Sequence, residues 1–364
     1  MTPLSRAWPH VGLRSGMMLA LAGMTCWRTP VTLEAVMPER CLGSLKRVRW
    51  LSHLRRCCVA VLLVLAVALV CGGGARAEEG EPLSGTLKTI NDRGTILIGY
   101  RESALPFAFL NKAGQPVGFS LDLCHGIAED VARTLNLDLL EPDAPGWQKG
   151  VRIVYVPVAA DERLPKVISG ALDLECGSTT ANAERARTVA FSPVFFLAGT
   201  KLMVQLGGKV ASYRDLAGHT IVVGAGTTNA EVIRRLANRV SPPITVAEAP
   251  DLNAAYAMLA AGNADAFASD DILLYGFIAT RPDGQHFSVV GDYLSFEPYA
   301  ITLRRDDPAF ADLVKSSFGR MAGEGTLSRL YARWLVDRLP TGETLNLPMS
   351  PQLAELYRML GQPD

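Results

Sequence analysis

Two short strand-like runs, each followed by a hydroxyl-rich turn and then a helix, constrain the fold of this chain more than any other feature. The first run, Leu172–Cys176, leads into the turn Gly177–Ala181 and a short helix that carries Arg185. The second run, Thr220–Val223, leads into the turn Gly224–Asn229 and another helix. Such a turn places unpaired N–H groups and the positive end of a helix dipole at the carboxyl end of a strand. Both turns are therefore candidate anion sites.

The segments around these turns alternate between strands and helices. In the first half, the expected strands and helices are, in chain order, 95–100, 119–135 (helix), 151–156, 163–169 (helix) and 172–176. In the second half they are 220–223, 230–240 (helix), 245–247, 252–261 (helix), 264–269, 287–290, 299–304, 308–323 (helix) and 350–360 (helix), with a segment of unassigned type at 325–335. This alternation predicts an α/β fold in which each half forms a mainly parallel sheet flanked by helices, with ligands at the carboxyl ends of the strands.

The first 77 residues have the pattern of a secretory signal. A basic pair at 55–56 precedes an apolar run at 57–71, and the small residues Ala75 and Ala77 form a cleavage site. We expect cleavage near Ala77 and export to the periplasm, and retention of the apolar run as a membrane anchor is the alternative. Translation from Met37 would bring the signal closer to the amino terminus.

Removal of this leader changes the charge of the protein. The full chain has 36 basic and 36 acidic residues, but the first 77 residues hold ten of the basic and two of the acidic ones. The remainder therefore has 26 Lys and Arg against 34 Asp and Glu, a net charge of −8. This balance argues against binding to nucleic acid or to an anionic membrane, so an anion site has to be built from individually placed donors.

Cysteine usage agrees with export. Five of the seven cysteines lie in the first 77 residues, which leaves Cys124 and Cys176. A disulfide and a pair of free buried thiols both remain open, because Cys124 lies on an expected helix and Cys176 at a strand end. No Cys or His spacing fits a metal site, and we expect neither a metal nor a cofactor.

Four motifs, in this order along the chain, resemble one known family. They are IGYRESALPF at 98–107, ECGSTTANAER at 175–185, GAGTTNAE at 224–231 and FASDD at 267–271. Together they are similar to the polar-amino-acid-binding receptors of bacterial ABC importers (solute-binding protein family 3), and within that family to the glutamate/aspartate binders. The resemblance extends over about residues 86–360.

The resemblance implies a two-lobed periplasmic binding protein fold of type II with two hinge segments. We expect an upstream extension and signal peptide at 1–77, lobe 1 at 78–199 plus 297–340, lobe 2 at 200–296 and a C-terminal tail helix at 341–364. Ligand binding in such a fold closes the cleft between the lobes.

The same resemblance implies the ligand contacts. Arg185 matches the arginine that binds the α-carboxylate of the ligand, and Asp270 matches the aspartate that binds the α-ammonium. The hydroxyl and backbone donors expected beside them are Ser178, Thr179, Thr180, Thr227 and Thr228. The charges agree with these roles independently, because an ammonium needs an ionised acceptor and a carboxylate needs a fork of donors.

Arg101, at the end of the first expected strand, indicates the side chain of the ligand. Receptors of this family for basic amino acids tend to carry an acidic residue at this place, so an arginine favours an acidic ligand. Leu252 is a departure, because the similar glutamate/aspartate binders tend to have a histidine there. Glutamate, aspartate, their amides and other small dicarboxylates therefore remain open.

Other functions fit the chain less well. The GAGTTN turn lacks the third glycine of a dinucleotide motif and the lysine of a P-loop. The fold also occurs in periplasmic cyclohexadienyl dehydratases and in the receptor-like part of some lytic transglycosylases, and Glu175 or Glu297 would then have to act as general acid. A ligand sensor would need a membrane span after the domain, and none is expected. We therefore expect a monomeric binding protein, not an enzyme, that delivers an acidic amino acid to an ABC permease.

Overall fold

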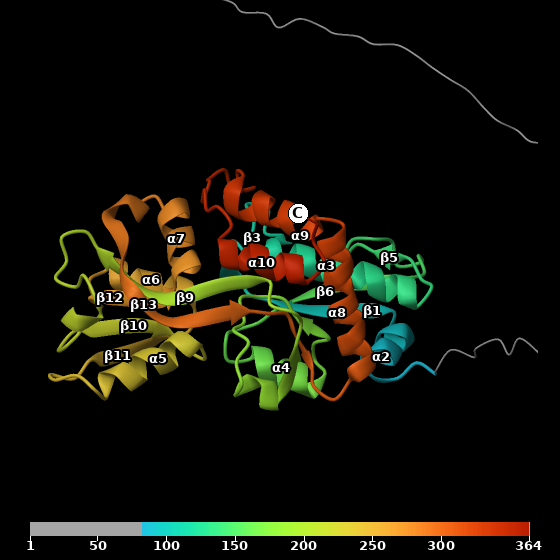
Figure 1. Cartoon of the computed structure of the whole chain (residues 1–364), viewed down its shortest axis with the longest axis horizontal. Coiled ribbons are helices and arrows are strands. Elements are labelled where there is room, and N and C mark those ends of the chain that lie inside the picture. The colour runs from blue at the N-terminus through green and yellow to red at the C-terminus, as the bar shows by residue number, and fades with distance from the viewer. Residues whose placement is uncertain (1–81, 364) are drawn as a thin grey trace, which may run out of the picture. The chain divides into compact units, whose positions relative to one another are not determined.

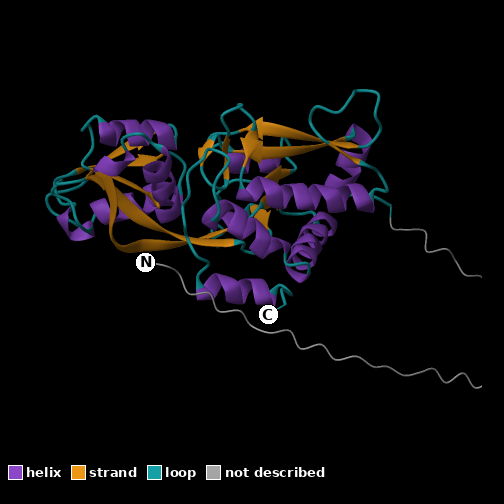
Figure 2. Cartoon of the chain, turned by 90° about the horizontal axis from the view of Figure 1, so that it is seen from above, coloured by secondary structure: helices purple, strands orange, loops and turns teal. Residues whose placement is uncertain are grey.

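The computed structural model describes residues 82–363, which form a two-lobed α/β fold. The expected signal at 1–77 lies outside the described residues. Figure 1 shows that the long strands β9 (Phe196–Gln205) and β13 (Phe287–Tyr299) run from one lobe to the other. In Figure 2, helices flank the strands of both lobes. No helix within residues 82–363 is both long and apolar enough to cross a membrane.

Lobe 1 is built on a six-stranded sheet. Its strands are β1 Thr95–Tyr100, β5 Leu139–Leu140, β6 Val151–Pro157, β7 Leu174–Glu175, β8 Val189–Phe191 and β14 Thr302–Arg304. Their order is β5-β6-β1-β7-β14-β8, and only the two pairs made by β14 are antiparallel. The helices are α2 Gly85–Arg93, α3 Phe119–Thr134, α4 Arg163–Ser169, α8 Pro308–Gly323, α9 Thr326–Tyr331 and α10 Pro351–Met359. A small antiparallel sheet consists of β2 Ser103–Ala104, β3 Ala108–Leu110 and β4 Pro116–Val117.

Lobe 2 is built on a five-stranded sheet in the order β11-β10-β12-β9-β13. Its own strands are β10 Thr220–Gly224, β11 Thr245–Ala249 and β12 Ala266–Asp270, and its helices are α5 Thr228–Ala237, α6 Leu252–Ala260 and α7 Asp271–Thr280. Strands β10, β11 and β12 pair in parallel, whereas β9 and β13 join antiparallel. Both large sheets are therefore mixed, and their parallel parts place several strand ends at one edge.

Strands β9 and β13 are the two segments that connect the lobes. They pair antiparallel from Phe196 opposite Tyr299 to Gln205 opposite Phe287, with a register shift between Val290 and Ser295. The expected boundaries at 199/200 and 296/297 fall inside these continuous strands. The assignment of residues to the two lobes by those boundaries stays a prediction.

An aromatic cluster supports the junction between the lobes. The ring of Tyr299, the last residue of β13, lies 5.0 Å from the ring of Phe107 and 5.8 Å from that of Phe196. Phe195 and Phe119 extend the same cluster, with their rings 5.6 Å apart. Four of these five side chains are fully buried and Phe196 is nearly so, and their edge-to-face and tilted packing holds the end of β13 in a fixed position.

Sequence pattern and structure agree closely for the helices at 163–169 and 308–323, which α4 and α8 match at both ends. The expected strand at 299–304 is two elements, because β13 ends at Tyr299 and β14 begins at Thr302. Helix α7 was not expected. Its sequence, DILLYGFIAT, is apolar on nearly every side and so lacks the periodicity that marks an amphipathic helix.

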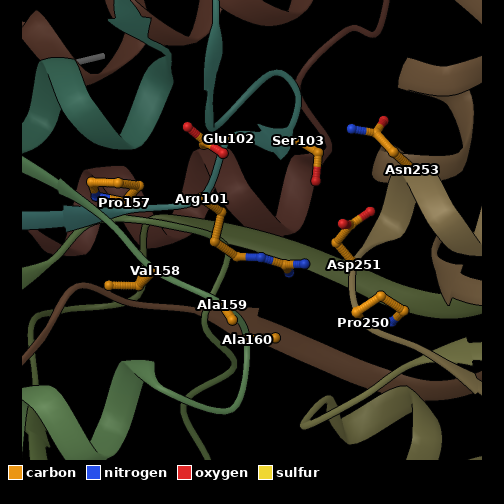
Figure 3. A pocket seen from close by; sticks show the side chains of 10 residues that line it. All are labelled: Arg101, Glu102, Ser103, Pro157, Val158, Ala159, Ala160, Pro250, Asp251 and Asn253. Carbon is orange, nitrogen blue, oxygen red and sulfur yellow. The ribbon is translucent and has the colours of Figure 1, made fainter.

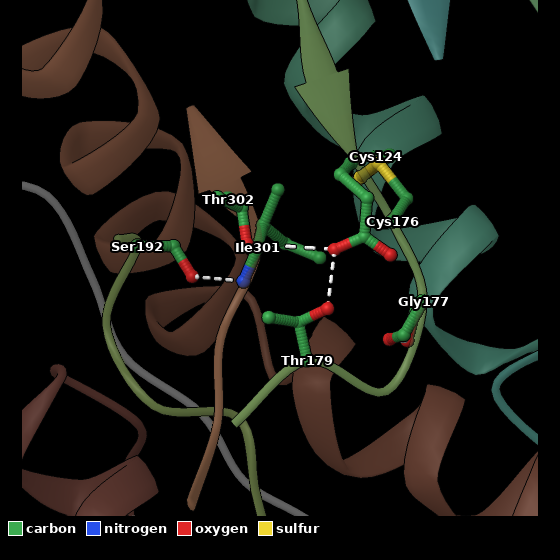
Figure 4. The surroundings of a disulfide bond; sticks show 9 residues. Cys124, Cys176, Gly177, Thr179, Ser192, Ile301 and Thr302 are labelled. Atoms are coloured by element: carbon green, nitrogen blue, oxygen red, sulfur yellow. Dashed lines mark hydrogen bonds between the residues drawn. A yellow bond between two sulfur atoms is a disulfide. The ribbon is translucent and has the colours of Figure 1, made fainter. Parts of the chain in front are cut away.

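A disulfide joins Cys124 of α3 to Cys176, the residue after β7 (Figure 4). Their Cα atoms lie 6.4 Å apart, and the sequence had left this bond open. Both residues are fully buried. The bond fixes the start of the turn 177–181 against α3.

Candidate functional site

Residues from both lobes meet at one small cavity of about 10 Å³, close to the volume that one water molecule needs. Lobe 1 contributes Arg101, Arg163, Ser178, Thr180 and Arg185, and lobe 2 contributes Thr227, Thr228, Asn229, Leu252, Ser269, Asp270 and Leu273. Arg101 directly follows β1 and Asp270 ends β12, whereas Ser178 and Thr227 lie in the turns that follow β7 and β10. The cavity therefore lies where a sheet of this topology is expected to bind a ligand.

Three arginines of lobe 1 make part of the cavity cationic. Arg101 follows β1 and Arg163 begins α4, and only 4% and 3% of their surfaces are exposed. Arg185 is half-buried and donates from Nη1 to the carbonyl oxygen of Thr180 at 3.0 Å. Within residues 82–363, none of the three forms an ion pair with a carboxylate.

Burial and mutual repulsion disfavour the charge of these arginines. Loss of water, and next the charge of Arg163, lower the pKa of Arg101 to about 10. The same two causes, in the same order, lower the pKa of Arg185 to about 10. Both groups remain charged at neutral pH, so this side of the cavity holds positive charge that a bound anion would compensate.

Asp270 of lobe 2 supplies a buried carboxylate in the same cavity. It accepts hydrogen bonds from Asn229 Nδ2 at 2.7 Å and from the hydroxyl of Tyr299 at 2.5 Å. Burial, and next the charge of Glu297, raise the pKa of Asp270 to about 7, although both hydrogen bonds act in the opposite direction. A cationic group placed beside Asp270 would favour its ionised form.

The expected hydroxyl residues have different surroundings. Ser178 lines the cavity, and within the described residues its buried Oγ has no hydrogen-bond partner. Thr180 and Thr228 also line it, and both donate to Glu297, at 2.7 and 2.6 Å. Thr227 uses its side chain to cap α5. Ser178, like Ser269, therefore has a hydroxyl proton that it can donate to a ligand.

Thr179 was expected to contact the ligand, but it is not among the described residues that line the cavity. Its hydroxyl donates to Glu175 at 2.6 Å and accepts from Arg163 Nη1 at 2.5 Å. Glu175 is fully buried and also accepts from Thr302 at 3.4 Å. Because successive side chains of an extended segment point to opposite sides, Thr179 faces away from the cavity that its two neighbours line. It connects Arg163 to a buried carboxylate.

A more open groove meets the cavity at Arg101. Its lining comes from both lobes: Arg101, Glu102, Ser103, Pro157, Val158, Ala159, Ala160, Pro250, Asp251 and Asn253. Figure 3 shows the side chain of Arg101 extending from lobe 1 toward Asp251. Since Arg101 lines both spaces, it lies between the enclosed cavity and the open groove.

Sequence reasoning missed several residues that line this cavity or hold its lining residues. Arg163 was expected only as the first residue of a helix, although that helix follows a strand whose carboxyl end faces the same sheet edge. Asn229 closed the glycine-rich turn without an assigned role, and Tyr299 was expected only as part of a strand. Glu297 was considered only as a general acid, whereas it accepts hydrogen bonds from the cavity threonines.

This arrangement suits a small ligand that carries both signs of charge. Guanidinium groups bind carboxylates through two parallel hydrogen bonds, and a buried carboxylate binds an ammonium. A ligand with two carboxylates and one ammonium would compensate both the cationic wall and Asp270. In the described part of the chain, no group of three or more His, Cys, Asp and Glu could hold a metal ion.

Comparison with known proteins gives consistent matches. The model of the family "Bacterial extracellular solute-binding proteins, family 3" matches residues 96–337. The L-glutamate/L-aspartate-binding protein of Pseudomonas aeruginosa is 33% identical over 295 residues, which cover 80% of this chain and 94% of that protein. The glutamate/aspartate import solute-binding protein of Escherichia coli strain K12 is 31% identical over 297 residues, covering 81% and 94%.

Solved structures share the fold. A mutant of the protein ArgBP from T. maritima superposes with a TM-score of 0.58 at 27% identity, covering 68% of this chain and 98% of that one. An ancestral amino acid-binding protein, described as a precursor of cyclohexadienyl dehydratase, gives a TM-score of 0.57 at 26% identity, with coverage of 69% and 99%.

Proposed function

The chain belongs to the bacterial extracellular solute-binding proteins of family 3, and we propose that it captures glutamate or aspartate and delivers it to the permease of an ABC importer. The observation that carries this proposal is a cavity in which arginines without carboxylate partners among the described residues face the same space as Asp270. Relatives named as glutamate/aspartate-binding proteins support the same class of ligand.

The charges of the cavity suggest a role for each group. We assign the α-carboxylate of the ligand to Arg185 and Ser178, and its α-ammonium to Asp270. Arg101 and Arg163 would then bind the side-chain carboxylate. The separation of the cationic residues on lobe 1 from Asp270 on lobe 2 supports this division, because one ligand held by both lobes would draw them together.

We propose a transport role without catalysis. A general acid has to reach the leaving group of its substrate, and neither Glu175 nor Glu297 is among the described residues that line the cavity. Glu297 in addition accepts hydrogen bonds from four hydroxyl groups. The name of the family, with the expected signal and a net charge of −8 after its removal, supports a monomer in the periplasm that does not bind nucleic acid.

Isothermal titration of the mature protein tests this function. The ligands are glutamate, aspartate, glutamine, asparagine, arginine and histidine, and we expect one of the two acidic amino acids to bind most tightly. Arg185→Ala should weaken every ligand by about 2–5 kcal/mol, because it leaves a desolvated carboxylate unpaired. Arg187→Ala, at an exposed position of the same turn, is the matched control and should bind like the wild type. Tightest binding of arginine or histidine would contradict the proposal.

A further inference from the structure

The carboxylate of Glu297 accepts hydrogen bonds from hydroxyl groups of both lobes and of both connecting strands. Glu297 lies on β13 and only 2% of its surface is exposed. Its Oε2 accepts from Thr180 at 2.7 Å and from Thr228 at 2.6 Å. Its Oε1 accepts from Ser295 at 2.5 Å and, more weakly, from Thr200 at 3.5 Å. Within residues 82–363, no Lys, Arg or His forms an ion pair with this carboxylate.

The direction of these hydrogen bonds determines whether Thr180 and Thr228 act as donors or as acceptors toward a ligand. A hydroxyl group has one proton to donate and two lone pairs, whereas an ionised carboxylate only accepts. Thr180 and Thr228 both give their proton to Glu297. Their own oxygens, 3.3 Å apart, therefore present lone pairs to the cavity that they line. Both threonines act there as acceptors.

The number of hydrogen-bond acceptors in the cavity matches the number of donors on an ammonium group. An ammonium has three N–H donors, and the cavity presents three oxygen acceptors of this kind: Asp270, Thr180 and Thr228. Ser178 differs, because its buried hydroxyl has no partner among the described residues and can donate to a carboxylate. A hydroxyl group on the ligand, in place of the ammonium, would bring one donor and leave two buried acceptors unpaired.

We propose that Glu297 is a positioning residue that holds Thr180 and Thr228 as acceptors for the α-ammonium, and so makes the site select amino acids over the matching 2-hydroxy acids. This inference rests on the proposed function. It concerns the amino end of the ligand, so it is independent of which side chain the ligand carries.

Glu297→Gln tests the inference with almost no change in shape. Where the NH₂ group of the amide takes the place of Oε2, it donates to Thr180 and Thr228, and both turn their protons toward the cavity; where it takes the place of Oε1, Ser295 accepts from it instead. A proton turned toward the cavity opposes an ammonium but not a ligand hydroxyl. Sites built around such hydrogen bonds reject analogues that lack them by about 10⁴-fold, so even partial loss is measurable.

The experiment is isothermal titration of the mature protein with L-glutamate and with (S)-2-hydroxyglutarate, the weaker ligand being measured by competition. In Glu297→Gln we expect glutamate to bind about 10- to 100-fold more weakly, as for the loss of one or two buried hydrogen bonds, and 2-hydroxyglutarate to change by less than about threefold. The ratio of the two affinities should therefore fall at least tenfold. An equal loss for both ligands would show a purely structural role and overturn the inference.

Glu175→Gln is the matched control. It also removes a fully buried carboxylate that accepts from two threonines, but those are Thr179 and Thr302, which do not line the cavity. Through Arg163 it should weaken both ligands by the same factor and leave their ratio unchanged.

Two changes at Thr228 keep the inference testable if Glu297→Gln fails to fold, as circular dichroism would show. Thr228→Ser retains the hydroxyl and should retain the affinity ratio, whereas Thr228→Val removes the acceptor and should lower the ratio. Equal ratios in the two variants would overturn the inference. If the wild type binds a different amino acid, the proposed function fails, and the same comparison with that amino acid and its 2-hydroxy acid still tests the role of Glu297.

Discussion

Replacement of Arg101 by methionine should weaken the binding of an acidic ligand and, in the same protein, favour closure without a ligand. Methionine has a similar length and no charge. In the structure the pKa of Arg101 is lowered to about 10, first by burial and then by the charge of Arg163. Relative to an arginine in water, this lowering corresponds to roughly 3 kcal/mol against the charged form. Burial at this position therefore disfavours the charge of Arg101 by a cost of that order.

A carboxylate of the ligand beside Arg101 would instead favour the charged form of the guanidinium group. Loss of one partner from a buried pair of opposite charges typically costs about 2–5 kcal/mol, which corresponds to a glutamate affinity lower by about 30-fold to several thousand-fold. Glutamine carries no side-chain charge, so Arg101→Met should change its affinity far less. Isothermal titration with both ligands measures this difference.

Small-angle scattering measures the second effect. Without a ligand, Arg101→Met should have a smaller radius of gyration than the wild type, because the charge that opposes closure is gone. Arg187→Met removes an exposed arginine and is the control for net charge. Glutamate affinity within about threefold of the wild type would refute the reasoning and indicate that Arg101 serves the open groove.

Three further predictions concern charge, closure and stability. The pKa of Asp270 is raised to about 7, so below that pH its carboxyl is protonated and cannot pair with an ammonium. The affinity for glutamate should therefore fall roughly tenfold per pH unit below about 7 and stay constant above it. Titrations at pH 5.5 to 8 measure this dependence. A methyl group on Gly226 would lie 2.7 Å from the backbone of Asp161 in the other lobe, so Gly226→Ala should prevent closure of the lobes around glutamate, as measured by small-angle scattering. Gly262 has the same left-handed backbone but open space around it, so Gly262→Ala is the control and should close normally. Reduction of the disulfide, which spans 52 residues, should lower the free energy of unfolding in urea by about 4 kcal/mol, and an unchanged midpoint would contradict this.

The sequence predicted the parts of the site that depend on local pattern. A strand followed by a hydroxyl-rich turn is encoded within a dozen residues, and Ser178, Thr180 and Thr228 do line the cavity. Arg163 and Glu297 were missed as site residues because their roles depend on contacts between distant segments. The hydrogen bond between Thr180 and Glu297, for example, joins residues 117 positions apart, which no periodicity reveals.

Helix α7 shows a second limit of pattern reading. An apolar segment without periodicity is compatible with strand, loop and buried helix, so the element after Asp270 stayed unassigned. In the structure Asp270 precedes α7 as its N-cap residue but makes no side-chain cap hydrogen bond. The carboxylate instead accepts from Asn229 and Tyr299, one from each side of the junction between the lobes. Two hydrogen bonds from distant segments, and not a cap of α7, therefore hold the side chain of Asp270 in the cavity.

Leu252 and Leu273 bear on the choice between glutamate and aspartate. Both are buried and line the cavity, so the place where a histidine was expected offers apolar surface and no donor. The two ligands differ by one methylene, whose burial contributes about 0.8 kcal/mol, or roughly a fourfold difference in affinity. A larger preference has to come from the reach of Arg101 and Arg163, because only these side chains would bind the side-chain carboxylate in the proposed site. Arg101 extends into the open groove as well, and its flexible stem can follow a carboxylate through about the length of one bond. The physics of the site therefore favours a receptor that accepts both acids and excludes their amides by charge.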